Sequence, residues 1–234
     1  MEEIKISPEV IFDGPIFKIT NSLFTSFVVS LVILIFIFFF RKKISLMPKG
    51  FYNFFESIVE AFYNFVLENL PEKGKKFFPL IFTIFFYIFL NNLFGILPII
   101  SGVKIGQDQH LFRSTFSDIN MTIALAICTM IIVHLLSLKE LKLAHLKKFL
   151  NFSNPINFFI GILEGFSEIS KVVSFSFRLF GNIFAGEVVL VIIGTILPLI
   201  APMPFLALEM FIGFIQALIF SFLIMMFLKI NLEH

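Results

Sequence analysis

The chain contains 234 residues, of which 58% are hydrophobic and only 15% are charged. A soluble domain carries roughly 25% charged residues, so this composition excludes a water-soluble globule. The single cysteine excludes an intrachain disulfide framework and a CxxC metal site, and the net charge of +2 is too small to indicate a nucleic-acid partner.

Five stretches are apolar and long enough to cross a hydrocarbon core about 30 Å thick, which takes roughly 20 helical residues. They predict an all-α membrane protein with transmembrane helices over residues 22–40, 77–98, 119–138, 157–197 and 205–228. The first stretch begins late and has no basic leader, which favours a retained span over a signal peptide. We expect residues 1–21 to form an extracytoplasmic tail and residues 22–234 to form one membrane domain.

Between the first two spans, residues 50–70 are apolar except for one line of polar side chains. These recur every three or four residues, which is the spacing of a single helical face: Asn53, Glu56, Glu60, Asn64 and Glu68. We therefore expect an interfacial amphipathic helix that lies in the membrane surface with its acidic edge in water.

The connections 41–76 and 139–148 contain most of the lysines and arginines that lie between spans. Cytoplasmic loops carry such an excess, so we expect both connections and the C-terminus to be cytoplasmic and the N-terminus to be outside. The basic string KELKLAHLKK adjoins a span, which favours a topology signal over RNA binding.

The stretch 157–197 differs from the other spans because charged residues interrupt its apolar sequence. It contains no proline, so a continuous helix would be roughly 60 Å long, twice the bilayer thickness. The helix could break near Gly181 or Gly186, but we favour a continuous helix that is steeply tilted. The proline-rich stretch 198–204 predicts a turn, so the last two helices should form a long antiparallel hairpin.

At 100° per residue, every strongly polar side chain from 164 to 182 falls within about 120° of the helix circumference. They form one stripe of seven residues: Glu164, Ser167, Glu168, Lys171, Ser174, Arg178 and Asn182. Glu187 lies outside this arc and should face a different compartment. In the last span, Glu209 and Gln216 share a face, and the hairpin should bring Arg178 and Gln216 close together near mid-membrane.

An arginine at membrane depth costs between about 3 and 17 kcal/mol unless a carboxylate or water accompanies it. Glu164 and Glu168 precede Arg178 by 14 and 10 residues, which is too far for a direct pair within one helix. Glu187 lies on the opposite face. Internal neutralisation of Arg178 is one interpretation, but we favour a partner carboxylate from another subunit. Lys171 has a simpler partner in Glu168, three residues earlier.

These residues occur in longer strings that resemble one known family. The string SKVVSFSFRLFGNIFAGE spans residues 170–187, and LEMFIGFIQALIFSFL follows it. LNNLFGILP at 90–98 and SDIN at 117–120 precede it in the same order. From about residue 15 to residue 230, the chain resembles subunit a of the F-type ATP synthase, and the RLFGN block is highly specific.

The resemblance implies a non-catalytic, ion-translocating stator subunit in the bacterial plasma (inner) membrane, with H⁺ as the expected ion. It would lie beside a rotating c-ring and assemble with the subunit b peripheral stalk and a soluble catalytic head. Arg178 would meet the carboxylate of each ring subunit, keep it ionised and block a direct leak between two half-channels. No cofactor is implied.

By the same resemblance, the cytoplasmic half-channel would include Glu164 and Ser167. The outside half-channel, or the zone around the arginine, would include Asn182, Glu187, Glu209 and Gln216. Asp118 and Asn120, at the outer end of the third span, would help to form the entry. For Ser167 and Asn182, a hydrogen bond to the backbone is an equally good interpretation.

The positions of Glu187 and Glu209 are often filled in this family by one carboxylate and one histidine, whereas both are glutamate here. Two carboxylates in one cavity do not both ionise cheaply, so we expect one of them to hold a proton near neutral pH. This leaves open whether His110 or His134 contributes instead.

Two other classes of protein would also carry charges within the membrane. A secondary transporter predicts internal repeats, and the two halves of this sequence show no convincing repeat. A membrane-embedded enzyme predicts a motif such as HExxH or GxSxG, and the sequence contains neither. We therefore favour the ion-translocating subunit.

Overall fold

The computed structural model describes residues 8–14, 18–41, 50–96, 104–105, 109–141, 155–197 and 200–233. Within these residues the chain forms six α-helices: α1 (Asn21–Arg41), α2 (Phe51–Asn69), α3 (Gly74–Ile96), α5 (Ile119–Leu141), α7 (Pro155–Ile196) and α8 (Pro202–Glu233). All of them except α2 contain a stretch that is long and apolar enough to cross a membrane. The predicted all-α membrane fold with five spans is thereby confirmed.

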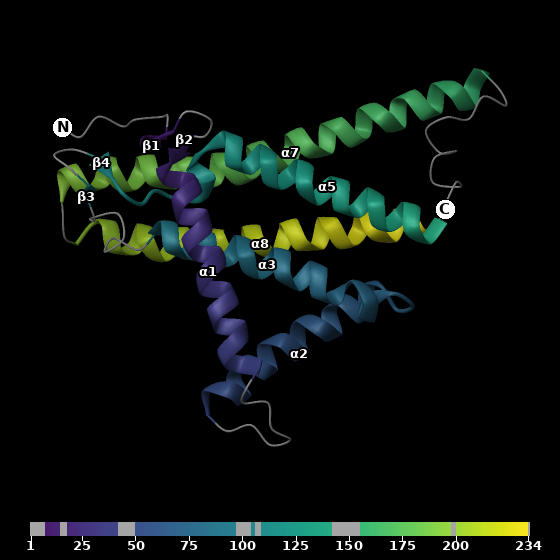
Figure 1. Cartoon of the computed structure of the whole chain (residues 1–234), viewed down its shortest axis with the longest axis horizontal. Helices are drawn as coiled ribbons and strands as arrows, with labels where there is room; N and C mark the ends of the chain where they lie inside the picture. Colours follow the sequence, from purple (N-terminus) through teal and green to yellow (C-terminus); the bar gives the residue numbers. More distant parts are fainter. Residues whose placement is uncertain are drawn as a thin grey trace.

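The two C-terminal helices, α7 and α8, run side by side as an antiparallel hairpin (Figure 1). Helix α5 packs on α7, and α3 packs on α8. Helix α1 runs across this layer rather than along it in the same view. Aromatic side chains pack between α7 and α8: the rings of Phe175 and Phe220 have centroids 4.7 Å apart.

Helix α7 is continuous over 42 residues, without a break at Gly181 or Gly186. At 1.5 Å per residue it is about 63 Å long, so the helix fits a bilayer only when it is inclined. Helix α8 begins at Pro202, three residues before the predicted start at residue 205. The missing N–H of a proline costs nothing in the first turn, because backbone N–H groups there have no intrahelical partner.

Helix α2 agrees with the expected amphipathic pattern. The predicted acidic line is exposed along its length: Asn53, Glu56, Glu60, Asn64 and Glu68. On the other face, Phe62 is buried and stacks on Phe85 of α3 with ring centroids 4.8 Å apart. The apolar face of α2 is therefore covered by α3, and the acidic edge is free to meet water.

Two short β-hairpins and one 3₁₀ turn were not predicted from the sequence. Strands β1 (Val10–Asp13) and β2 (Lys18–Thr20) pair antiparallel, as do β3 (Lys104–Ile105) and β4 (Gln109–His110). The turn η1 (Thr115–Ser117) precedes α5. The two hairpins are close to each other, because the His110 N–H donates to Glu9 Oε2 at 3.1 Å. Strands of two to four residues are too short to show a twofold pattern of polarity.

Candidate functional site

Arg178 lies on the surface of the subunit, in a shallow depression of about 240 Å³ along α7. The depression is lined by Ser167, Ser170, Lys171, Ser174, Phe175, Arg178, Leu223 and Phe227. The Arg178 guanidinium makes one weak hydrogen bond, from Nη2 to Ser174 Oγ at 3.4 Å. In the part of the chain that the structure describes, it has no ion-pair partner. This agrees with the expectation from helical spacing.

The nearest other charges on α7 are already paired. Lys171 Nζ donates to Glu168 Oε1 at 2.7 Å, as the spacing of three residues predicted. On its other side, Glu168 Oε2 lies 3.4 Å from Nε2 of His134 on α5. Lys171 also lies over the ring of Phe227, 4.4 Å from its centroid. Glu168 thus pairs with Lys171 and His134 and does not neutralise Arg178.

Asn182 joins the two helices of the hairpin one turn beyond Arg178. Its Nδ2 donates to Oε1 of Gln216 on α8 at 2.8 Å. The sequence predicted that Arg178 and Gln216 would be neighbours, but the hydrogen-bond partner of Gln216 is Asn182. The interpretation that Asn182 only bonds backbone is therefore replaced by a side-chain contact across the hairpin.

Glu209 of α8 is buried beside Gly186 of α7. Its side chain faces Gly186, and a Cβ added to Gly186 would lie 2.6 Å from Glu209 Oε1. Glu209 is 8% exposed, and its Oε2 has no hydrogen-bond partner within the described residues. The carboxylates of Glu187 and Glu209 interact electrostatically. The family resemblance implied that these two carboxylates share a cavity, and Glu209 lies against Gly186, the residue before Glu187.

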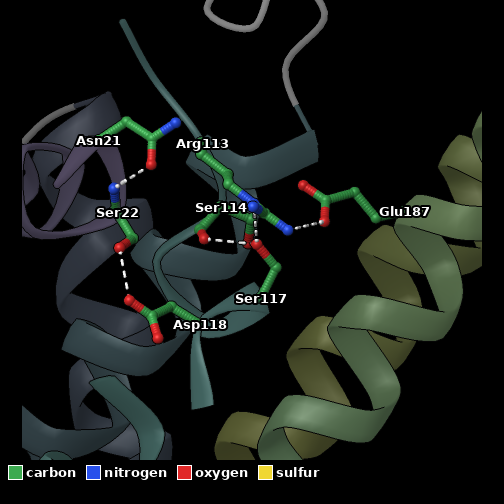
Figure 2. Close-up of polar contacts among 7 residues, drawn as sticks. All are labelled: Asn21, Ser22, Arg113, Ser114, Ser117, Asp118 and Glu187. Carbon is green, nitrogen blue, oxygen red and sulfur yellow. Dashed lines mark hydrogen bonds and ion pairs between the residues drawn. The ribbon is translucent and has the colours of Figure 1, made fainter. Parts of the chain in front are cut away.

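Glu187 faces away from Arg178, toward the connection that precedes α5. Nine residues separate the two side chains, and at 100° per residue this places them on opposite faces of α7. Glu187 Oε2 lies 3.7 Å from Nη2 of Arg113 (Figure 2). The expectation that Glu187 looks into a different compartment from the polar stripe agrees with this arrangement. Its cationic partner, Arg113, was not predicted.

Asp118 is a structural residue as well as a candidate for the outer entry. It precedes α5, and its Oδ1 accepts a hydrogen bond from the Asn120 N–H at 2.9 Å, as in an N-terminal helix cap. Its Oδ2 accepts from Ser22 Oγ of α1 at 2.8 Å. Asp118 is buried and Asn120 is exposed. The bonds of Asp118 explain its burial by structure alone, so its part in an entry path stays a prediction.

The remaining two candidates, Glu164 and Ser167, lie in the first third of α7. Glu164 is partly buried and Ser167 is exposed at the depression that contains Arg178. The structure thus places Ser167 and Arg178 on the open surface of α7, whereas Glu209 and Gln216 are buried and Glu187 is partly buried beside Arg113. Among the described residues, no group of three or more His, Cys, Asp or Glu side chains could hold a metal ion.

Sequence reasoning missed Arg113 and Asn92. Asn92 of α3 donates from Nδ2 to the backbone oxygen of Gly213 on α8 at 3.0 Å, between Glu209 and Gln216 in the sequence of α8. Both missed contacts join segments that are distant in the chain, so helical periodicity does not reveal them. The pair of asparagines at 91 and 92 in an otherwise apolar span was the signal available for Asn92.

Comparison with known proteins gives a consistent result. The family model described as ATP synthase A chain matches residues 23–229. The protein named ATP synthase subunit a from Citrifermentans bemidjiense is 33% identical over 82% of this chain and 79% of its own length. The subunit a from Trichlorobacter lovleyi is 30% identical over 92% of this chain and 88% of its own length. A third relative, ATP synthase subunit a 1 from Pelobacter propionicus, is 29% identical over 89% of this chain and 86% of its own.

Proposed function

Because this chain belongs to the ATP synthase A chain family, we propose that it is the ion-translocating stator subunit of an F-type ATP synthase and that it moves protons. Members of this family are non-catalytic, and the chain is a multi-pass membrane component of the ATP synthase complex. Its partners in that complex are a c-ring, subunit b of the peripheral stalk and the soluble catalytic head. The complex lies in a bacterial plasma membrane, with the N-terminus of this chain outside and the C-terminus in the cytoplasm.

One observation carries the proposal. Arg178 is a permanent cation on the open surface of α7, and no carboxylate of the described residues pairs with it. A guanidinium cannot neutralise itself by losing a proton, so at membrane depth it needs a negative partner. A carboxylate that arrives on the surface of a neighbouring ring supplies that charge, once for each ring subunit that passes.

The pairing gives Arg178 two tasks. A cation within a few ångströms favours the ionised form of the ring carboxylate, so each ring subunit releases its proton before it passes Arg178. The same fixed charge repels protons in transit and separates the path on one side from the path on the other. Proton flow is then coupled to rotation of the ring, which drives ATP synthesis in the catalytic head.

The two half-channels lie on either side of Arg178 along α7. Toward the start of the helix, Glu164 and Ser167 line the cytoplasmic half-channel. Toward its end, Glu187 and Glu209 line the outside half-channel. At 1.5 Å per residue, Glu164 lies about 21 Å before Arg178 and Glu187 about 14 Å after it, so the two paths are offset along the membrane normal even when α7 is inclined.

Co-purification tests this proposal. The chain, tagged at its C-terminus, should pull down a ring of small hairpin proteins, subunit b and a soluble ATPase head. Reconstituted in liposomes, the purified complex should acidify the vesicle lumen when ATP is added. A complex without such a ring, or one that hydrolyses ATP without moving protons in sealed vesicles, would refute the assignment.

A further inference from the structure

Residues 111–118, the connection that precedes α5, contact three helices. Toward α1, the Arg113 N–H donates to Thr25 Oγ1 at 3.3 Å. Toward α3, Thr115 Oγ1 donates to Asn91 Oδ1 at 2.8 Å. Toward α7, Arg113 Nη2 lies 3.7 Å from Glu187 Oε2 (Figure 2). The contacts with α1 and α3 therefore hold the segment 111–118, and this placement lets the Arg113 side chain contact α7.

A hydrogen bond within the same segment also orients the Arg113 side chain. Its Nε donates to Ser117 Oγ at 2.9 Å, and Ser117 Oγ in turn donates to the backbone oxygen of Ser114 at 2.9 Å. The Arg113 side chain is only 11% exposed, and Ser117 is fully buried. A guanidinium presents its N–H donors in a rigid fork, so holding Nε leaves the terminal nitrogens in a defined direction. That direction is toward Glu187.

We propose that Arg113 is a positioning residue for Glu187. It holds one carboxylate oxygen, Oε2, in place and leaves the second oxygen, Oε1, for proton exchange. This inference rests on the proposed function, since it takes Glu187 to be a member of the outside half-channel. It adds the connection before α5 to the functional parts of the subunit.

The physical reason is the freedom of a glutamate side chain. Glu187 is about one-third exposed, and without a fixed partner its three side-chain torsions allow several rotamers. A proton passes between two groups only when they are within hydrogen-bond reach. A carboxylate that samples several rotamers therefore spends less time at the distance that proton transfer needs. The charged groups that face Glu187 are Arg113 on the connection and Glu209 on α8. Of these two charged groups, Arg113 is the one that attracts it, and the Ser117 side chain also lies within hydrogen-bond reach of the carboxylate.

A double-mutant cycle in the assembled ATP synthase tests the proposal. ATP-driven proton pumping is measured in inverted membrane vesicles for the native chain, Arg113→Gln, Glu187→Gln and the double variant. Arg113→Gln should lower the pumping rate about tenfold in the native chain. In the Glu187→Gln background, the same change should lower the rate less than about twofold, because the group that Arg113 positions is no longer a carboxylate.

Thr115→Val is the matched control. It removes a buried hydrogen bond from the same connection without touching Glu187. Any effect of Thr115→Val should multiply unchanged with Glu187→Gln, as expected for a purely structural residue. Arg113→Lys should lower the pumping rate measurably but less than Arg113→Gln does, because an ammonium group keeps the positive charge beside Glu187 but has no Nε for Ser117 to hold.

Two results would overturn the inference: normal pumping by Arg113→Gln, or an equal fold-loss from Arg113→Gln in both backgrounds. If Arg113→Gln fails to assemble, the cycle is read with Arg113→Lys under the same criteria. If Glu187→Gln alone stops pumping, Glu187→Asp takes its place in the double-mutant cycle. Its side chain is one methylene shorter, so the carboxylate lies farther from Arg113. Arg113→Gln should then cost less in the Glu187→Asp background than in the native chain, and an equal cost would refute the inference.

A parallel Arg178→Ala sample separates this inference from the proposed function. If Arg178→Ala pumps normally, the proposed function itself fails. If Arg178→Ala is inactive while Arg113 and Glu187 act independently, only the positioning role of Arg113 fails.

Discussion

Asn182 and Gln216 are joined by a hydrogen bond of 2.8 Å between Nδ2 and Oε1, which ties α7 to α8 one helical turn beyond Arg178. Gln216 is 2% exposed, and its Nε2 has no partner among the described residues. The bond therefore helps to fix the register of α7 against α8, between Arg178 on the surface of α7 and the buried Glu209 of α8.

We expect Asn182→Ala to destabilise the hairpin, because it leaves the buried Gln216 amide without its partner. Loss of one partner from a buried hydrogen bond costs about 1–3 kcal/mol. The double variant Asn182→Leu with Gln216→Leu should recover much of this loss, since both polar groups are then replaced by apolar ones. The measurement is the temperature at which the subunit dissociates from the purified complex. Additive losses in the double variant would contradict the prediction.

Gly186→Ala should slow proton pumping without preventing assembly. The added Cβ would lie 2.6 Å from Glu209 Oε1 and 2.8 Å from its Cδ, so the carboxylate must move away. Gly194, on the same helix, is the matched control, because a Cβ there meets no atom within 4 Å. Pumping should fall for Gly186→Ala and stay near the native rate for Gly194→Ala. Equal rates in the two variants would remove Glu209 from the proton path.

The Glu168 carboxylate should stabilise the contact between α5 and α7. Its side chain is 12% exposed and lies 2.7 Å from Lys171 Nζ on α7 and 3.4 Å from His134 Nε2 on α5. We expect Glu168→Ala to cost about 1–3 kcal/mol, because it leaves the mostly buried donors of Lys171 without their partner. The Lys18–Asp13 pair provides the comparison, since both side chains are about 70% exposed and such pairs contribute about 0–1 kcal/mol. The temperature at which the subunit dissociates from the purified complex should therefore be lower for Glu168→Ala and nearly unchanged for Asp13→Ala.

The pair Glu187 and Glu209 should set the form of the pH dependence. Two interacting carboxylates lose their protons in two macroscopic steps that belong to the pair. Glu187→Gln and Glu209→Gln should each slow pumping and reduce the pH dependence of the rate to a single step. The check is the pumping rate measured from pH 5 to 9 in inverted vesicles. A pH profile that is unchanged in both variants would place the two carboxylates outside the path.

Much of the fold could be predicted because the bilayer imposes it. A span needs about 20 apolar residues, so charge-free stretches locate α1, α3, α5 and α8 to within a few residues. The continuity of α7 was less certain, since glycine at 181 and 186 permits a break as well as close packing. The structure shows why Gly186 is needed: Glu209 occupies the space that a Cβ would take.

The site was only partly predictable for a different reason. Helical spacing favoured an Arg178 without a partner on its own helix and a pair between Lys171 and Glu168, because both depend on local geometry. The contact between Arg113 and Glu187 depends on how a connection folds back between helices. No periodic pattern in the sequence reports such a contact.

The account depends most directly on Arg178, and ATP-driven proton pumping by the Arg178→Ala and Arg178→Lys complexes is the measurement that tests it. Ser170→Ala, in the same depression, is the control for packing. Both arginine variants should assemble with the ring and the catalytic head yet pump no protons above background, because alanine has no charge and a desolvated lysine can lose its proton. Proton pumping at the native rate by either arginine variant would contradict the account.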